Sequence, residues 1–153
     1  MTQGRQVLIS NRQRKAKVDC KRLRKVADLV LESLGFEEAE LSVLLVSDRR
    51  IQQLNRQYLG RNRPTDVLAF AQWEGGGEAL HPDWLGDVVI SAETAEEQAT
   101  REGAELNEEL DLLLVHGILH LIGYEHTGAP EEAAVMGKKQ KQLLRRIQKS
   151  LPP

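Results

Sequence analysis

The chain has 153 residues, 41% of them apolar and 29% charged, with a formal net charge of −2, which is typical of one soluble domain over residues 1–153. One cysteine excludes an intrachain disulfide and a cysteine-rich zinc cluster. No apolar run approaches the roughly 20 residues of a membrane helix and no apolar signal region follows the N-terminus, so we expect a cytoplasmic protein without membrane contacts.

The sequence predicts four strands and five helices. The apolar pattern predicts strands at about residues 7–10, 40–46, 65–70 and 86–90, and helices at about 20–34, 48–58, 92–101, 107–122 and 131–149. Asp19 and Ser91 are expected to cap their helices, and Ser47 or Asp48 the second helix. We expect an α+β fold in which a small, mostly four-stranded mixed sheet packs with about five helices.

Charge is distributed unevenly along this nearly neutral chain. Nine Lys or Arg and one acid lie between Arg5 and Lys25, and six Lys or Arg and no acid lie between Lys138 and Lys149. Such runs are either solvated faces or a path for a phosphate backbone. Both alternatives stay open, and any nucleic-acid binding would have to be local.

Three of the four histidines occur in one short window with the spacing H-x3-H-x5-H: His116, His120 and His126. Two histidines four apart share a helix face, and Gly123 can end the helix in a left-handed conformation that turns the chain back. That reversal could bring His126 to the other two. A core role is the alternative, but burying unsatisfied imidazoles is costly. The pattern predicts one zinc ion per chain, with a fourth position for water.

The same spacing occurs in metzincin proteases, where a glutamate after the first histidine is the general base. Here that position is Gly117, which cannot take a proton and suggests a close approach of the helix to its neighbour. Peptide hydrolysis is therefore not expected, whereas phosphodiester cleavage suits a metal with nearby arginines. Glu125, Asp66 and Asp87 are candidate proton carriers, and each could equally have a purely structural role.

Residues 116–126 resemble the signature H-G-x-L-H-L-x-G-Y-D-H of the YbeY family of bacterial rRNA maturation factors. Further pieces occur in family order: Leu54-Asn55 with Tyr58, residues 64–70 and residues 86–91. The resemblance covers about residues 40 to 145. It implies a zinc-dependent, single-strand-specific endoribonuclease that matures the 3′ end of small-subunit rRNA and acts in ribosome quality control. It also implies zinc-ligand roles for His116, His120 and His126, the first two of them on a zincin-like helix.

Three positions depart from the family pattern. Glu125 stands where the signature has aspartate, Ala69 replaces a serine, and Leu59 replaces an arginine to which the family pattern gives a functional role. Arg61 or Arg63 can supply the missing charge from the same turn. The candidate catalytic residues are therefore Glu125, Asp66, Arg61 and Arg63.

Two functions of different classes follow from these patterns. The first is a metal-dependent endoribonuclease acting on single-stranded RNA, rRNA and ribosomal particles, with no DNA substrate expected and with water or a 2′-hydroxyl as nucleophile. The second is a ribosome- or RNA-binding assembly factor with a structural zinc and little intrinsic nuclease activity. Loss of cleavage in a His120→Ala variant would favour the first.

Overall fold

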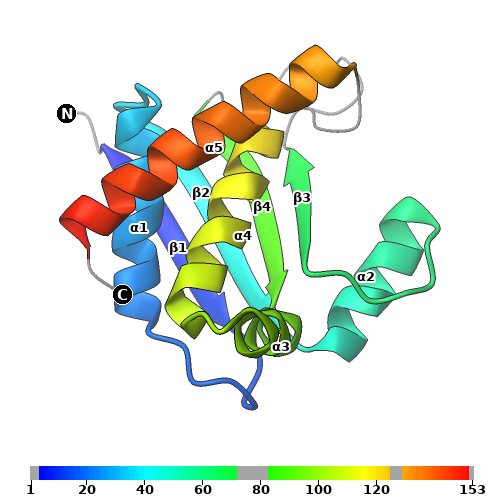
Figure 1. The fold of residues 1–153 in the computed structure, drawn as a ribbon. Helices are drawn as coiled ribbons and strands as arrows, with labels where there is room; N and C mark the ends of the chain where they lie inside the picture. The colour runs from blue at the N-terminus through cyan, green and yellow to red at the C-terminus, as the bar shows by residue number, and fades with distance from the viewer. Residues whose placement is uncertain (1–3, 72–82, 125–128, 152–153) are drawn as a thin grey trace.

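A computed structural model of the chain describes residues 4–71, 83–124 and 129–151. The strands of this part are β1 (Arg5–Asn11), β2 (Ala39–Val46), β3 (Val67–Ala71) and β4 (Trp84–Ser91). The helices are α1 (Cys20–Ser33), α2 (Asp48–Leu59), α3 (Ala92–Glu102), α4 (Leu106–Leu121) and α5 (Pro130–Ser150) (Figure 1). None of the helices described is both long and apolar enough to span a bilayer.

The four strands form one mixed sheet in the order β1-β2-β4-β3. The β1–β2 and β2–β4 pairs are parallel, whereas β3 runs antiparallel to β4. This places β3 at an edge of the sheet, although it precedes β4 in the chain. The predicted α+β class, the mixed four-stranded sheet and the five helices are confirmed for the described residues.

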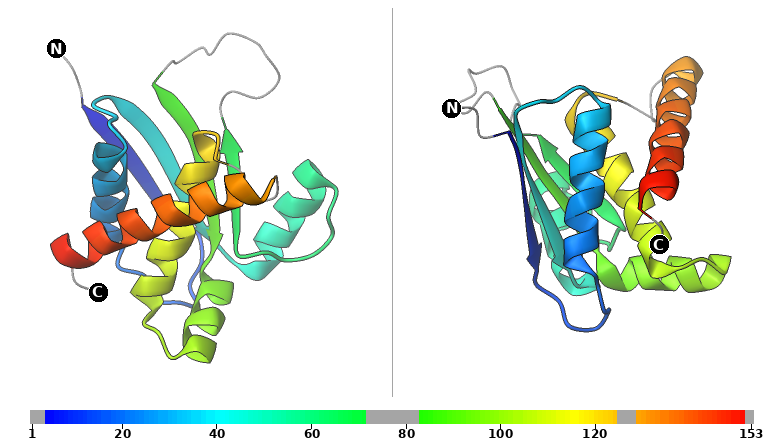
Figure 2. Two further views of the ribbon diagram at one scale, coloured as in Figure 1. Left: turned by 45° about the horizontal axis from the view of Figure 1, so that its top comes forward. Right: turned by 90° about the vertical axis from the view of Figure 1, so that its left-hand side faces the viewer.

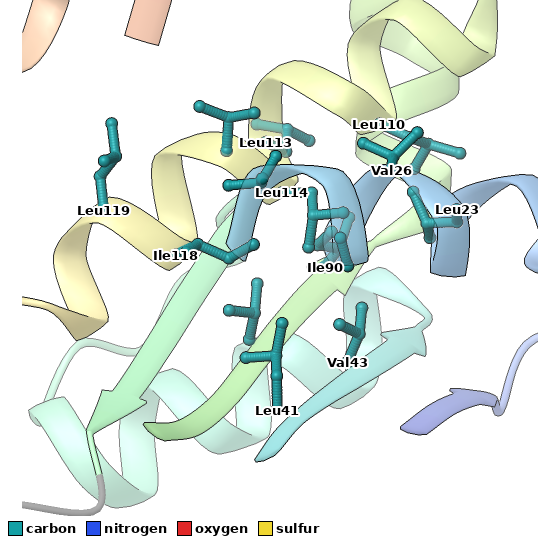
Figure 3. Packing of buried hydrophobic residues seen from close by; sticks show 14 of the residues in the cluster. Leu23, Val26, Leu41, Val43, Ile90, Leu110, Leu113, Leu114, Ile118 and Leu119 are labelled. Atoms are coloured by element: carbon teal, nitrogen blue, oxygen red, sulfur yellow. The ribbon is translucent and has the colours of Figure 1, made fainter. Parts of the chain in front are cut away.

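Helices α1, α4 and α5 lie over one face of the sheet (Figures 1 and 2). The period-2 alternation of the strands sends Leu41, Val43 and Leu45 of β2 to this face, where they join residues of α1 and α4 in the main core (Figure 3). The intervening Leu44 and Val46 belong to a smaller cluster with Ile51 and Leu54 of α2, Leu68 and Val89. The second face of the sheet therefore packs against α2 through this smaller cluster.

Short polar side chains begin three of the helices, as predicted. The side chains of Asp19, Ser47 and Ser91 each accept a hydrogen bond from the backbone N–H three residues on, at the starts of α1, α2 and α3. Ser47, and not Asp48, is thus the cap of α2.

The strand boundaries differ from the predicted ones by up to two residues, and β1 runs from Arg5 to Asn11 instead of 7–10. β4 begins at Trp84, two residues before the predicted strand, because Glu40 of β2 pairs with Trp84. β3 begins at Val67, so Thr65 and Asp66 precede the strand. Both differences come from pairing with a distant strand, which a local apolar pattern does not contain.

Candidate metal centre

Helix α4 places His116 and His120 side by side, one turn apart on its half-buried face. Their Nε2 atoms are 3.2 Å apart, and their ring centroids are 4.7 Å apart with an interplanar angle of 70°. The i, i+4 spacing therefore brings the two imidazoles to one point, as predicted from the sequence.

The distance between these two nitrogens suits a shared zinc ion. Tetrahedral zinc with Zn–N bonds of about 2.0–2.1 Å holds two ligand nitrogens about 3.3–3.4 Å apart. Two neutral imidazoles are also a donor set that zinc prefers. Within residues 4–71, 83–124 and 129–151 no group of three metal-binding side chains occurs. The predicted third ligand, His126, and its neighbour Glu125 lie outside the described residues.

Gly117 sets how closely α4 approaches the sheet between the two histidines. A Cβ atom at this position would lie 2.6 Å from Cγ1 and 3.2 Å from Cγ2 of Val88, and 3.4 Å from Cγ2 of Val67. Real Cβ atoms do not come within 3.0 Å of another heavy atom, so only glycine fits without a shift. The predicted close approach is confirmed. Because this position faces the sheet, a metzincin-type glutamate would have no room there.

The chain reverses at the end of α4, at Gly123. This residue has φ +103°, in the region that favours glycine. The N–H of Gly123 donates to the carbonyl of His120 (3.1 Å), and the N–H of Tyr124 donates to the carbonyl of Leu119 (3.0 Å). This is the Schellman pattern, and the predicted left-handed helix end is confirmed. Residues 125–128 continue beyond it and are not described.

A cleft of about 490 Å³ opens beside the two histidines. It runs along the edge strand β3, with the end of α2 and the turn after it on one side and α4 on the other. Its lining residues are Asn55, Leu59, Arg61, Arg63, Thr65, Asp66, Val67, Leu68, Ala69, Ala71, His116, Gly117, His120 and Leu121. Three of the four candidate catalytic residues, Asp66, Arg61 and Arg63, thus share a cleft with the two described histidines, which the spacing alone could not predict.

Asn55 holds the turn that carries the two arginines. It is 3% exposed, and its side-chain Nδ2 donates to the backbone carbonyl of Arg63 (2.9 Å). Its backbone carbonyl accepts from the N–H of Arg61 (3.3 Å). Gly60 ends α2 with φ +69°. A buried amide in this place therefore orients the arginine turn toward the cleft. In the sequence, Asn55 stood out only within the family motif. A polar residue on the apolar face of α2, beside Ile51 and Leu54, could have indicated that its side chain is buried and makes a hydrogen bond.

Asp66 connects the cleft to the neighbouring elements. Its Oδ2 accepts a hydrogen bond from Nε2 of Gln98 on α3 (3.3 Å), and its carbonyl accepts from the N–H of Ser91 (2.9 Å). The carboxylate is half-buried. Asp66 thus lines the cleft and also joins β3 to α3, so both roles expected from the sequence are compatible with its position.

Gln140 is a site residue that the sequence reasoning missed. It belongs to α5, and its Oε1 lies 3.2 Å from Nδ1 of His116. The available signal was a polar residue on the apolar face of the last helix, between Met136 and Leu143, which are both buried. Nothing local indicated which side chain it would meet.

Comparison with known proteins gives one family. A family model described as endoribonuclease YbeY matches residues 8–148. The endoribonuclease YbeY of Pelotomaculum thermopropionicum is 47% identical over 149 residues, covering 92% of this chain and 96% of that protein. That of Syntrophus aciditrophicus is 43% identical over 138 residues, 90% of this chain and 86% of that protein. The solution structure of TM1509 from Thermotoga maritima matches with a TM-score of 0.64 at 28% identity, covering 93% of this chain and 89% of that one.

Proposed function

This chain belongs to the endoribonuclease YbeY family, and from that premise we propose that it is a zinc-dependent endoribonuclease specific for single-stranded RNA. Its proposed role is rRNA processing, notably maturation of the 3′ end of small-subunit rRNA, and ribosome quality control in the cytoplasm. Its proposed partners are rRNA and ribosomal particles. One observation carries the proposal: two histidines with Nε2 atoms 3.2 Å apart line a cleft that two arginines also line.

In this proposal His116, His120 and His126 hold one zinc ion. Bound zinc lowers the pKa of a coordinated water and polarises a phosphoryl oxygen. The residues of the chain position the RNA for this chemistry. Arg61 and Arg63, on the turn held by Asn55, neutralise phosphate charge, since guanidinium groups bind phosphate oxygens in a bidentate manner.

Proton transfer is assigned to carboxylates in the same proposal. Asp66 lines the cleft, and Glu125 is adjacent to the third histidine in the sequence. A carboxylate within hydrogen-bond reach of the attacking hydroxyl, whether water or a 2′-hydroxyl, can act as general base. The position of Asp66 in the cleft wall supports this role.

The experiment is cleavage of a labelled single-stranded RNA by protein whose zinc content has been measured. We expect cleavage by the wild type and none by His120→Ala, with a duplex of the same sequence left intact. His120→Asn, which keeps a polar side chain, serves if the alanine variant does not fold. Equal trace cleavage by the wild type and a folded, zinc-depleted variant would reject the nuclease.

The second candidate is an RNA-binding assembly factor with a structural zinc. Leu59 favours it, because an apolar side chain that is 53% exposed lines the cleft where the family pattern has an arginine. Undiminished RNA binding and ribosome maturation by the non-cleaving His120→Ala variant would support this candidate over the nuclease.

A further inference from the structure

A hydrogen bond joins α5 to the first of the two described histidines. Helix α5 lies across α4 (Figure 1), with Met136, Leu143 and Ile147 buried between α5 and the rest of the fold. Gln140 occupies the same face, four residues after Met136 and three before Leu143, and is half-buried. From there its Oε1 lies 3.2 Å from Nδ1 of His116. A polar side chain on this packing face therefore ends on the ring that faces the cleft.

The chemistry of this contact selects one tautomer of the imidazole. A carboxamide oxygen only accepts hydrogen bonds, so in a neutral ring this contact calls for the proton on Nδ1 of His116 and leaves the lone pair on Nε2. That Nε2 is the atom 3.2 Å from Nε2 of His120, and both histidines line the cleft. Only a nitrogen with a free lone pair can bind a metal ion, and the partner of the other nitrogen sets which one this is.

We propose that Gln140 is a positioning residue that holds His116 as the Nδ1–H tautomer, with Nε2 directed at the metal. The part concerning metal affinity rests on the proposed function, whereas the tautomer is a property of the chain itself. The carboxamide fixes the ring without adding a negative charge. A carboxylate at the same place would fix the same tautomer and make the ring more basic.

Three variants of the full chain test the role of the side chain in zinc binding. Gln140→Leu keeps the size but removes the acceptor, and its zinc affinity should fall by about 10–100-fold. Gln140→Glu keeps the acceptor and should bind zinc at least as tightly as the wild type. Gln142→Leu is the matched control, since Gln142 is exposed on the same helix, and it should leave the affinity unchanged. The affinities are measured by competition with a chromophoric chelator.

The tautomer is measured separately on zinc-free protein. Long-range ¹H–¹⁵N spectra of the histidine rings, recorded in alkaline buffer where the rings are neutral, distinguish Nδ1–H from Nε2–H. We expect Nδ1–H at His116 in the wild type and in Gln140→Glu, and a mixture of tautomers in Gln140→Leu. Nε2–H at His116 in the wild type would overturn the proposal, because Gln140 would then be donating through its NH₂ group.

The two readouts separate this inference from the proposed function. If Gln140→Leu binds zinc as tightly as Gln142→Leu, the positioning role is wrong while the metal site stands. If Gln140→Leu fails to fold, an affinity of Gln140→Glu well below that of the wild type rejects the role. If zinc does not bind to the wild type at all, the proposed function fails and the spectra still decide the tautomer.

Discussion

At the scale of single residues, the contact between Gly117 and Val88 decides where the histidines lie. Position 117 faces the sheet, and a Cβ there would be 2.6 Å from Cγ1 of Val88. His116 and His120 flank it on the same helix, so any outward shift of α4 moves both rings relative to β3. The glycine is therefore part of the geometry of the candidate site, although it has no functional group.

We expect Gly117→Ala to destabilise the protein. The crowding costs about 1–3 kcal/mol, whereas alanine in a helix gains about 1 kcal/mol over glycine. Gly137→Ala is the matched control, because nothing lies within 4 Å of a Cβ at that position in α5. It should stabilise the fold by up to about 1 kcal/mol. Urea unfolding measures both changes, and equal stabilisation by the two substitutions would contradict the close contact.

Glu109 gives a pH-dependent prediction. Burial in α4, together with the negative charges of Glu102 and Asp66, raises the pKa of its carboxyl group. The folded state thus holds this proton more tightly than the unfolded chain, in which the pKa of a glutamate side chain is about 4.3. The resulting stabilisation is present below that value and is lost as the pH rises through the raised pKa.

Glu109→Gln should therefore be more stable than the wild type at neutral pH, and this advantage should shrink in acid. Thermal unfolding at neutral and at acid pH measures this difference in stability between the variant and the wild type. Glu97→Gln, which removes a carboxylate at an exposed position of α3, is the control. An advantage of Glu109→Gln that stays constant with pH, or one shared by Glu97→Gln, would mean that the Glu109 carboxylate is not destabilised in the fold.

At the scale of elements, a buried ion pair holds α4 against α1. Arg22 of α1 donates through both Nη atoms to the two carboxylate oxygens of Asp111 at 2.8 Å, and the side chains are only 11% and 6% exposed. Burial raises the pKa of the Asp111 carboxyl, and Arg22 opposes this increase. Because α4 also carries the histidines, the pair contributes to the position of the candidate site.

Removing one partner leaves a buried charge, so Arg22→Met should cost about 3–5 kcal/mol of unfolding free energy. The double variant Arg22→Met with Asp111→Leu should recover much of this loss, because no unpaired charge remains. Arg146→Met is the control. Its ion pair with Glu32 is half-exposed on both sides, so its loss should cost less than about 1 kcal/mol. Similar losses for Arg22→Met and Arg146→Met would be inconsistent with a buried pair.

Local signals in the sequence predicted the elements well. The caps Asp19 and Ser91 and the left-handed Gly123 occur where expected, because each acts through the backbone within a few residues of itself. The start of β4 at Trp84 was missed, because this residue is in a strand through its pairing with Glu40, more than 40 positions away. Gln140 was missed for the same reason, since its partner is on another helix.

At the scale of the whole molecule, the cleft is a product of topology. The strand order β1-β2-β4-β3 puts β3 at the sheet edge, and this edge brings Arg61 and Arg63 beside His116 and His120. More than 50 residues separate the two pairs in the sequence. The sequence patterns identified the arginine pair and the histidine pair separately. Only the family resemblance indicated that the two pairs belong to the same site. The packing of β3 against α4 supplies the physical reason.

Helix α5 carries a stripe of basic side chains, Lys138, Lys141, Arg145 and Lys149, which are exposed and three or four residues apart. If this stripe binds RNA phosphates, removing one phosphate-binding side chain should lower the log–log slope of affinity against salt by about 0.7. Lys141→Gln with Arg145→Gln tests this by fluorescence anisotropy of a labelled single strand. Arg49→Gln with Arg50→Gln makes the same charge change at the start of α2. Equal slopes for the two double variants would mean that the side chains of the stripe are solvated and do not contact the RNA.

We propose that His116 and His120 hold a zinc ion at the cleft of a ribonuclease. The most direct measurement is an anomalous difference map at the zinc edge from crystals of zinc-loaded protein that cleaves single-stranded RNA. We expect one peak per chain about 2.0–2.1 Å from both Nε2 atoms, with His126 as the third ligand. A peak at another site, or none in protein that still cleaves RNA, would contradict it.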